Sequence, residues 1–568
     1  MPASTPQHIL IAQAWPYANG SLHLGHITAF LGADILARYH RLKGDSVLFV
    51  SGSDCYGTPI AVEAAAQQVS PATIAEKYHQ EFRKTLINDL SFSYDHYGAT
   101  TDVPHREFVQ DIFLSLHKKG HLYTKKDTVL FSPSLNQFLP DRFVEGECPH
   151  CGFASARGDQ CDECGRLLDA RSLKNPHANP KIFGDRAKQG ERLEERESEH
   201  FYLRLSAFQD EIGQLVEERG GAWRQQAAQF TKRFVENGLQ DRPVTRDTDW
   251  GIPIPIDGYD GKRIYVWFEA VLGYLSAAKV RAGADWDRWW RSDKAKHYYV
   301  HGKDNILFHT VILPAILVGS DKDLHLPDAV FSSEYLLLEG RQFSTSRNYA
   351  VWAHEFCRSF DGELLRYFLT VQGPETSDTN FQWSSFGELV NGELIGTFGN
   401  LVHRICSFVE KHVPEGVTVD AMSESAEQLC TAARQLHKTV GEHIESGQFR
   451  KALRSIIEVA EAGNRFAQQT EPWKRIQEDR ERATSDLAVL LHVIHTLSIA
   501  VQPFLPKTSK TIQSFFGGET VSSDQDSPTK GAWGKESPTT FKIRSTAPLF
   551  QKIEEAVVEK QKEALSGE

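Results

Sequence analysis

A Gly-rich turn that carries two histidines, within residues 14–26, constrains the fold of this chain more than any other stretch. Before it, residues 8–12 form an apolar run of strand length, and after it residues 27–43 place apolar side chains at helical spacing. A second apolar run, residues 46–50, completes a strand, helix and strand within about 45 residues. Such a βαβ unit binds phosphates where its helix begins, because backbone N–H groups and the helix dipole favour negative charge there. The sequence therefore predicts a nucleotide-phosphate site at this turn.

The two histidines of the turn, His23 and His26, are three residues apart, so both rings lie on one face of the first helical turn. They could donate hydrogen bonds to phosphate oxygens whose charge grows as pyrophosphate leaves. Two histidines can also simply cap a helix, and His-x-Gly-His alone leaves that alternative open. With Pro-Tyr-Ala-Asn-Gly in front (residues 16–20), the stretch resembles the HIGH motif of class I aminoacyl-tRNA synthetases, in its methionyl form. The resemblance implies that His23 and His26 are catalytic and that both, with Gly25, bind ATP.

Four of the eight cysteines stand in two C-x₂-C pairs about ten residues apart. The pairs consist of Cys148, Cys151, Cys161 and Cys164. Four thiolates at this spacing can surround one tetrahedral Zn²⁺, whereas a disulfide framework is improbable in a large cytosolic chain. Because thiolates fill all four positions, we expect one structural zinc ion with no role in catalysis.

Composition excludes few functions. The chain of 568 residues is 40% hydrophobic and 24% charged, with a net charge of −12, which argues against a protein that coats nucleic acid but permits local contact with one RNA. No run of about 18 apolar residues occurs, and residues 1–7 lack a charged start followed by an apolar core. We therefore expect a cytoplasmic protein without a membrane segment.

The pattern of apolar and polar residues changes along the chain. Alternating strands and helices predict a doubly wound parallel-sheet (Rossmann-like) α/β domain. Short strands at 122–123 and 128–132 and the cysteines interrupt this pattern, which returns with apolar strands at 263–268 and 297–301. Amphipathic patterns at 386–412, 424–446, 449–469 and 483–502 predict an all-α bundle, and a final charged helix is expected at 549–564. The expected domains are 1–118 (first catalytic half), 119–234 (connective-peptide insertion with a zinc knuckle), 235–330 (second half), 331–385 (KMSKS-like loop and stem-contact region) and 386–568 (α-helical anticodon-binding domain with a C-terminal tail).

Asp54 follows the second predicted strand, at the edge where open α/β sheets bind ligands. A carboxylate there could hold an α-ammonium group or could cap the next helix. The segment Asp54–Pro59 is similar to the Asp-x-x-Gly-Thr-Pro motif of methionyl-tRNA synthetases, which implies contact between Asp54 and the amino group of methionine. Aromatic residues around 265–274 could form core or could wall a thioether pocket. Val-Trp-Phe-Glu-Ala (266–270) resembles the family's Val-Trp-Phe-Asp-Ala, with Glu269 as a departure, and the resemblance extends the methionine pocket to Ala14, Trp15, Tyr17, Trp267, Ala270, Tyr274, Asn305 and His309.

Two further motifs concern ATP. By resemblance, Gly302 and Asp304 of Gly-Lys-Asp bind the adenosine moiety. Residues 340–347 resemble the KMSKS loop, but Gln342 and Thr345 replace its two lysines. The resemblance implies catalytic roles for Ser344, Thr345, Ser346 and Arg347, and an ATP contact for Thr345. We expect Arg341 or Arg347 to take over the phosphate contact.

In the helical segment, Trp473 stands beside a proline and a lysine, a setting that suits stacking on an unpaired base or packing between helices. The resemblance implies that Trp473, with Asn400 and Arg404, contacts the tRNA anticodon. Over the whole chain it implies a monomeric methionine–tRNA ligase that uses ATP with Mg²⁺, L-methionine and tRNA(Met). Two alternatives remain: a repurposed adenylate-forming paralogue, or an inactive tRNA-binding paralogue, since the loop lacks both lysines.

Overall fold

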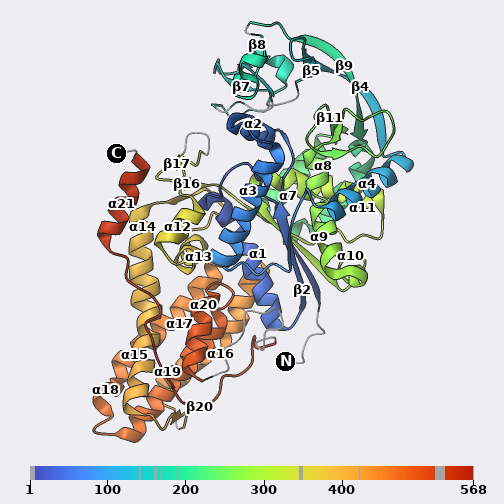
Figure 1. Cartoon of the computed structure of the whole chain (residues 1–568). Coiled ribbons are helices and arrows are strands. Elements are labelled where there is room, and N and C mark those ends of the chain that lie inside the picture. The colour runs from blue at the N-terminus through green and yellow to red at the C-terminus, as the bar shows by residue number, and fades with distance from the viewer. Residues whose placement is uncertain are drawn as a thin grey trace.

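The computed structural model describes residues 7–139, 143–158, 161, 163–164, 166, 168–188, 190–344, 349–420, 422–517 and 531–566. These residues form an elongated molecule with three tiers (Figure 1). A small β module lies at one end, an α/β domain lies in the middle, and a helical bundle forms the other end. The predicted combination of an α/β domain, an insertion and a bundle is confirmed.

The central sheet contains five parallel strands in the order β15-β14-β1-β2-β3. Its strands are β1 (His8–Gln13), β2 (Ser46–Ser53), β3 (His96–Ala99), β14 (Ala295–Gly302) and β15 (Ala329–Ser333). Alternate residues of β1 enter two hydrophobic cores, one on each face of the sheet, which explains its unbroken apolar run. Because the strand order reverses between β1 and β14, a crevice opens at their carboxyl ends, and the motif-bearing segments follow these strands.

The helices that cover this sheet include α1 (Leu24–Lys43), α4 (Val103–Lys118), α9 (Gly273–Ala282) and α11 (Leu313–Ser320). The predicted strand at 263–268 is wrong in part: β13 (Arg263–Ile264) is short, and α8 (Val266–Ala270) follows at once. A short apolar run cannot distinguish a strand from a buried helical turn, since both bury consecutive side chains. The helical turn buries Val266, Phe268 and Glu269.

The insertion is built on one long antiparallel ribbon. The two short strands predicted at 122–123 and 128–132 are one strand, β4 (Leu122–Ser132), which pairs along its length with β9 (Glu194–Leu203). The sequence did not predict one continuous strand, because the middle of β4 is charged and exposed and therefore carries no apolar side chains. Beyond the ribbon, the module that carries the cysteines packs against α2 (Thr58–Gln67) through Val62 and Ala65.

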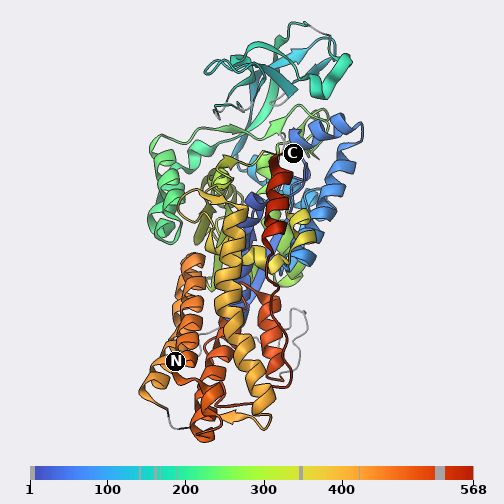
Figure 2. The ribbon, with the colours of Figure 1, turned by 90° about the vertical axis from the view of Figure 1, so that its left-hand side faces the viewer.

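The helical end confirms the predicted bundle. Its main helices are α14 (Trp383–Leu389), the π-helix η10 (Val390–Gly399), α15 (Asn400–His412), α16 (Glu424–Glu445), α17 (Phe449–Thr470), α19 (Arg480–Ala500) and α20 (Pro506–Phe515). Among the described residues, α19 alone is long and apolar enough to be a candidate membrane span, but 78% of its apolar window is buried, as in a core helix. The C-terminal helix α21 (Glu555–Ser566) returns along the bundle to pack on α14 (Figure 2).

Candidate active site and its supporting sites

The two histidines cap the helix that follows them, one of the two roles that the sequence left open. His23 is the N-cap of α1, and its Nδ1 accepts a hydrogen bond from the Gly25 N–H at 3.1 Å. The Nδ1 of His26 accepts from the His23 N–H at 3.2 Å, which completes a reciprocal cap. Because both Nδ1 atoms are acceptors, the ring proton of each neutral histidine lies on Nε2. Capping therefore fixes the tautomer and leaves two Nε2–H donors.

The charge state of these rings follows from their surroundings. Burial lowers the pKa of His26 to about 4, and burial together with the nearby His26 lowers the pKa of His23 well below its usual range. Both rings are therefore neutral at pH 7. They stack with 3.8 Å between centroids, and Phe343 stacks on the other side of His23 at 4.7 Å. This contact joins the histidines to the loop that resembles KMSKS.

Of that loop, Ser344 lies within the described residues, and its backbone exchanges two hydrogen bonds with Tyr349, both 2.9 Å long. The predicted catalytic residues Thr345, Ser346 and Arg347 lie outside the described residues. Arg341 lies in β17 (Arg341–Gln342) with an exposed side chain. Lys303, of the Gly-Lys-Asp motif, binds Glu334 at 2.8 Å and Asp378 at 3.0 Å.

The residues predicted to bind adenosine lie at the carboxyl end of β14, one of the two strands that flank the crevice. Gly302 ends β14, and Asp304 lies in the 3-10 turn η8 (Lys303–Asn305) directly after it. Asp304 Oδ1 accepts a 2.6 Å hydrogen bond from the Tyr335 hydroxyl. Tyr335 was not predicted, because it comes from a separate segment after β15 and no local motif marks it.

Backbone hydrogen bonds bring the segment after β1 beside Asp54. The Asp54 N–H donates to Pro16 O, and the Ala18 N–H donates to Asp54 O, both at 2.8 Å. The N-cap of α2 is Gly57, so Asp54 does not cap that helix; its Oδ1 accepts from the Tyr56 N–H at 3.3 Å. Asp54 is 4% exposed, and burial followed by the charge of Glu269 raises its pKa well above the usual range.

The remaining pocket residues converge from three segments. Trp15 lies on two glycines, Gly52 and Gly273, where an added Cβ would come within 2.5 and 2.7 Å of its ring, so the indole fits only because both side chains are absent. The Tyr274 hydroxyl donates to His309 Nε2 at 2.7 Å, because His309 Nδ1–H is used at 2.8 Å by the Asn305 carbonyl. The structure thus brings these predicted methionine residues to the same edge of the central sheet: Ala14, Trp15, Tyr17, Asp54, Tyr274, Asn305 and His309. Trp267 and Ala270 lie on α8, beside them in the chain.

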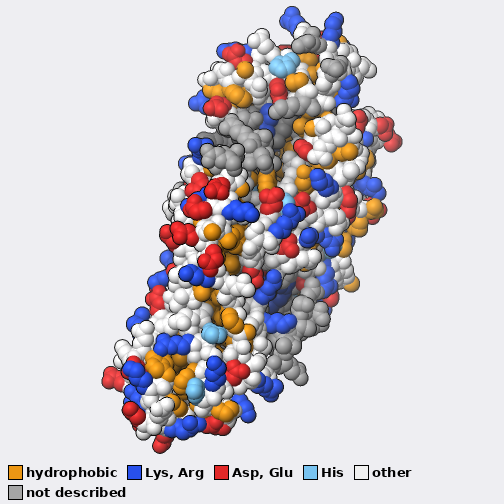
Figure 3. Space-filling model, turned by 60° about the vertical axis from the view of Figure 1, so that its left-hand side comes forward, with side chains coloured by type: hydrophobic (Ala, Val, Ile, Leu, Met, Phe, Trp, Pro, Cys, Tyr) orange, Lys and Arg blue, Asp and Glu red, His pale blue; other side chains and the backbone are white. Residues whose placement is uncertain are grey.

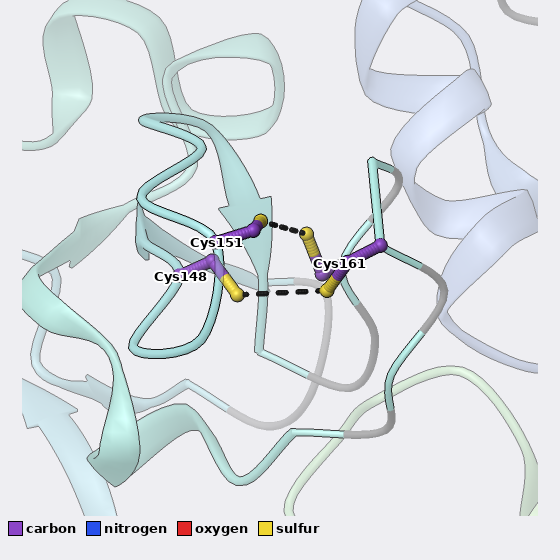
Figure 4. Close-up of side chains that lie close together, drawn as sticks. Cys148, Cys151 and Cys161 are labelled. Carbon is purple, nitrogen blue, oxygen red and sulfur yellow. Dashed lines mark hydrogen bonds between the residues drawn. The ribbon is translucent and has the colours of Figure 1, made fainter.

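The four cysteines form the predicted cluster. Their sulfur atoms lie within 4.8 Å of one another, and Figure 4 shows Cys148, Cys151 and Cys161 turned toward a common point. The sulfur atoms of Cys148 and Cys164 lie 3.9 Å apart, and those of Cys151 and Cys161 lie 3.6 Å apart. Zn–S bonds of about 2.3 Å require sulfur atoms about 3.8 Å apart in a tetrahedron. The thiols therefore fit one zinc ion with no ligand position left over.

At the far end of the bundle, the predicted anticodon residues Trp473 and Arg404 touch. The Arg404 guanidinium lies 3.6 Å from the centre of the Trp473 ring, a cation–π contact. Asn400, the first residue of α15, lies one helical turn before Arg404 and is exposed. Figure 3 shows acidic and basic side chains interspersed over one long face of the molecule, so any RNA contact there is local.

The parallel sheet with strand order 3-2-1-4-5 and the histidine pair at its crevice agree with the class I aminoacyl-tRNA synthetases, the class that the family comparison shows. A family model described as class I tRNA synthetases (M) matches residues 9–406, and a model for the anticodon binding domain of methionyl tRNA ligase matches residues 413–568. The chain belongs to the methionyl-tRNA synthetase family.

Whole-chain comparisons agree. The chain is 42% identical over 568 residues to a methionine–tRNA ligase of Bacillus cereus (strain Q1), covering 98% of this chain and 99% of that one. It is equally identical over 564 residues to a ligase of Bacillus mycoides (strain KBAB4), with the same coverage. In fold, it is similar to Mycobacterium tuberculosis methionyl-tRNA synthetase in complex with methionyl-adenylate, with a TM-score of 0.79, 22% identity, and coverage of 96% of this chain and 99% of that chain.

Proposed function

We propose that this protein ligates L-methionine to tRNA(Met) in two steps. Methionine and ATP form methionyl-adenylate and pyrophosphate, and the methionyl group then passes to the 3′-terminal ribose of the tRNA. The observation that carries the proposal is the convergence of two neutral Nε2–H donors, Asp54 and the Gly302–Asp304 turn at one edge of the central sheet. The full-length match to curated ligases gives the repurposed and the inactive alternatives no support.

In the first step, His23 and His26 donate to phosphate oxygens, Gly25 lets the backbone approach the phosphates, and Mg²⁺ accompanies ATP. An added Cβ at Gly25 would lie 2.9 Å from the His23 ring, so glycine at this position also makes room for the ring that caps α1. Gly302 and Asp304 bind the adenosine. The carboxylate of methionine attacks the α-phosphate while its α-ammonium group rests on Asp54 and its thioether packs against aromatic rings.

The residues proposed to line the methionine site are Ala14, Trp15, Tyr17, Asp54, Trp267, Ala270, Tyr274, Asn305 and His309. The chain Tyr274–His309–Asn305 supports a specificity role, because a fixed hydrogen-bonded wall resists repacking around a branched side chain.

The loop without lysines needs another source of positive charge. We propose that Arg341 or Arg347, with Thr345 and backbone N–H groups, stabilises the pyrophosphate. The stacking of Phe343 on His23 supports a position of this loop beside the phosphates. Removal of one such donor typically costs about 2.7–4 kcal/mol of transition-state stabilisation. If Arg341→Ala and Arg347→Ala both left pyrophosphate exchange intact, this part of the proposal would be wrong.

The other predicted parts have supporting roles. Cys148, Cys151, Cys161 and Cys164 would hold one zinc ion, which folds the module that packs on α2 and has no part in the reaction. The bundle would bind the anticodon through Trp473, Asn400 and Arg404. We propose the domain division 1–118, 119–234, 235–330, 331–385 and 386–568, and a monomer that works in the cytoplasm.

Charging of tRNA tests the proposal. Purified protein with ATP, Mg²⁺ and radiolabelled methionine should convert tRNA(Met), but not a tRNA with another anticodon, into acid-precipitable methionyl-tRNA. The doubly substituted His23→Ala/His26→Ala protein should lose at least 10²-fold in rate, because both transition-state donors are gone. A protein that charges no tRNA with methionine would refute the proposed function.

A further inference from the structure

A buried hydrogen-bond chain lies beside two of the residues proposed to bind methionine, Trp15 and Asp54, and includes a histidine that no motif marks. Glu269 on α8 is 0% exposed, and its Oε2 lies 2.8 Å from His105 Nε2. His105 on α4 is 3% exposed, and its Nδ1 lies 2.9 Å from Ser276 Oγ. The other carboxyl oxygen, Glu269 Oε1, is buried with no hydrogen-bond partner among the described residues.

The direction of each bond in this chain can be assigned. The Ser276 hydroxyl donates to the Gly273 carbonyl at 3.1 Å, so Oγ is free to accept from His105 Nδ1–H. The lone pair of His105 Nε2 then faces the Glu269 carboxyl. A contact of 2.8 Å between these atoms requires one proton between them, and this proton makes the pair neutral as a whole. Burial lowers the pKa of His105 to about 3 and raises the pKa of Glu269, so the proton resides on the carboxyl.

This neutrality matters because of Asp54. Both carboxyl groups are almost fully buried; burial raises the pKa of Asp54, and a charge on Glu269 would raise it further, so Asp54 ionises for the α-ammonium group only when Glu269 is uncharged. Methionine brings one positive charge on its α-ammonium group, and one buried carboxylate balances it. A second charged carboxylate would push a proton onto Asp54 or would leave a buried charge unpaired. Trp15, one of the residues proposed to bind methionine, lies beside this chain, with its ring 6.0 Å from the His105 ring.

We propose that His105, held by Ser276, is a positioning residue that keeps the Glu269 carboxyl uncharged, so that Asp54 alone carries the negative charge that receives the α-ammonium of methionine. This inference rests on the proposed function of the pocket. It assigns to Glu269, the departure from the family's aspartate, an internal hydrogen bond instead of a contact with substrate. Other titratable groups that act on this network are Asp102, near His105, and Cys55, Tyr56 and Tyr274, near the two carboxyls.

Substitution of His105 and Glu269, alone and together, tests the proposal. His105→Ala removes the acceptor for the carboxyl proton and leaves a space that water can fill, which relieves the burial of Glu269, so Glu269 ionises more readily and competes with Asp54. We expect the methionine KM in ATP–pyrophosphate exchange, and the Kd from calorimetry, to rise about tenfold, because apparent affinity falls with the fraction of competent protein. The KM for ATP should change less than threefold. The double variant His105→Ala/Glu269→Gln should recover at least fivefold of the lost affinity, because the glutamine cannot ionise.

Controls separate this role from a merely structural one. His297→Ala removes another buried histidine, whose Nε2 is 2.7 Å from Trp289 O near the opposite end of β14, and should leave the methionine KM unchanged. If His105→Ala does not fold, Ser276→Ala should raise the methionine KM about threefold, again relieved by Glu269→Gln. A His105→Ala protein with an unchanged methionine KM, or one that Glu269→Gln fails to rescue, would overturn the inference. Wild-type protein that binds methionine but exchanges no pyrophosphate would refute the proposed function and still permit the Kd comparison.

Discussion

The junction between the catalytic domain and the bundle depends on one buried arginine. Arg366 of α13 (Gly362–Val371) is 0% exposed, and its Nη2 lies 2.8 Å from Asp34 Oδ2 on α1, which is also 0% exposed. The same guanidinium donates to Phe504 O at 2.7 Å, Pro503 O at 3.0 Å and Leu90 O at 3.2 Å. Arg366 therefore joins α1 to the turn between α19 and α20.

The substitution Arg366→Ala should lower the free energy of unfolding by about 3 kcal/mol, the lower end of the usual effect of removing one partner from a buried ion pair, because Asp34 keeps its 2.7 Å ion pair with Arg38. The three carbonyls that lose a donor add to the loss where water does not reach them. The measurement is urea unfolding, followed by tryptophan fluorescence, with the midpoint of the first transition compared between variants. Because the change loosens the bundle, tRNA charging should fall more than pyrophosphate exchange.

Arg434→Ala is the matched control, because Arg434 pairs with Glu427 at 2.5 Å on the surface, where the two side chains are 45% and 51% exposed. It should cost less than about 1 kcal/mol. An Arg366→Ala protein that unfolds at the same urea concentration as the control would refute this account of the junction.

Three further outcomes follow from the site geometry. Metal analysis should find one zinc ion per chain in the wild-type protein and less in Cys148→Ser, and calorimetry should show a lower melting temperature for this variant. Full zinc content in the variant would exclude the cysteine cluster as the zinc site. Burial lowers the pKa of His26 from 6.5 to about 4, so the unfolded chain binds more protons than the folded protein between these pH values. The neutral His26 ring therefore contributes about 3 kcal/mol to the free energy of unfolding above pH 6.5, and this contribution is lost as the pH falls toward 4. Equal urea midpoints at pH 7 and pH 5 would contradict this. Trp473→Ala should raise the KM for tRNA at least tenfold and leave methionine-dependent exchange unchanged; equal effects in both assays would indicate a packing role instead.

Local patterns predicted the order of elements well. The apolar runs at residues 8–12 and 46–50 are buried on both faces of the sheet, which leaves unbroken apolar runs of strand length. The helices of the bundle bury one face each, which leaves a helical period in the sequence. The short run at 263–268 has no such period, and its division into a strand and a helix depends on tertiary packing around Glu269.

The site was predictable only where its residues share a motif. His23, Asp54 and Asp304 belong to short motifs, and the four cysteines have a ligand spacing. Tyr335 and His105 have none, because each reaches its partner across the fold: 31 residues separate Tyr335 from Asp304, and 164 separate His105 from Glu269.

The central claim is that a member of the methionyl-tRNA synthetase family without loop lysines still activates methionine. The most direct test is ATP–pyrophosphate exchange by the purified protein with methionine as the amino acid, and with leucine, isoleucine and cysteine in parallel. We predict exchange that depends on methionine and that the other three amino acids do not support. Absence of exchange with methionine, or equal exchange with leucine, would contradict the account.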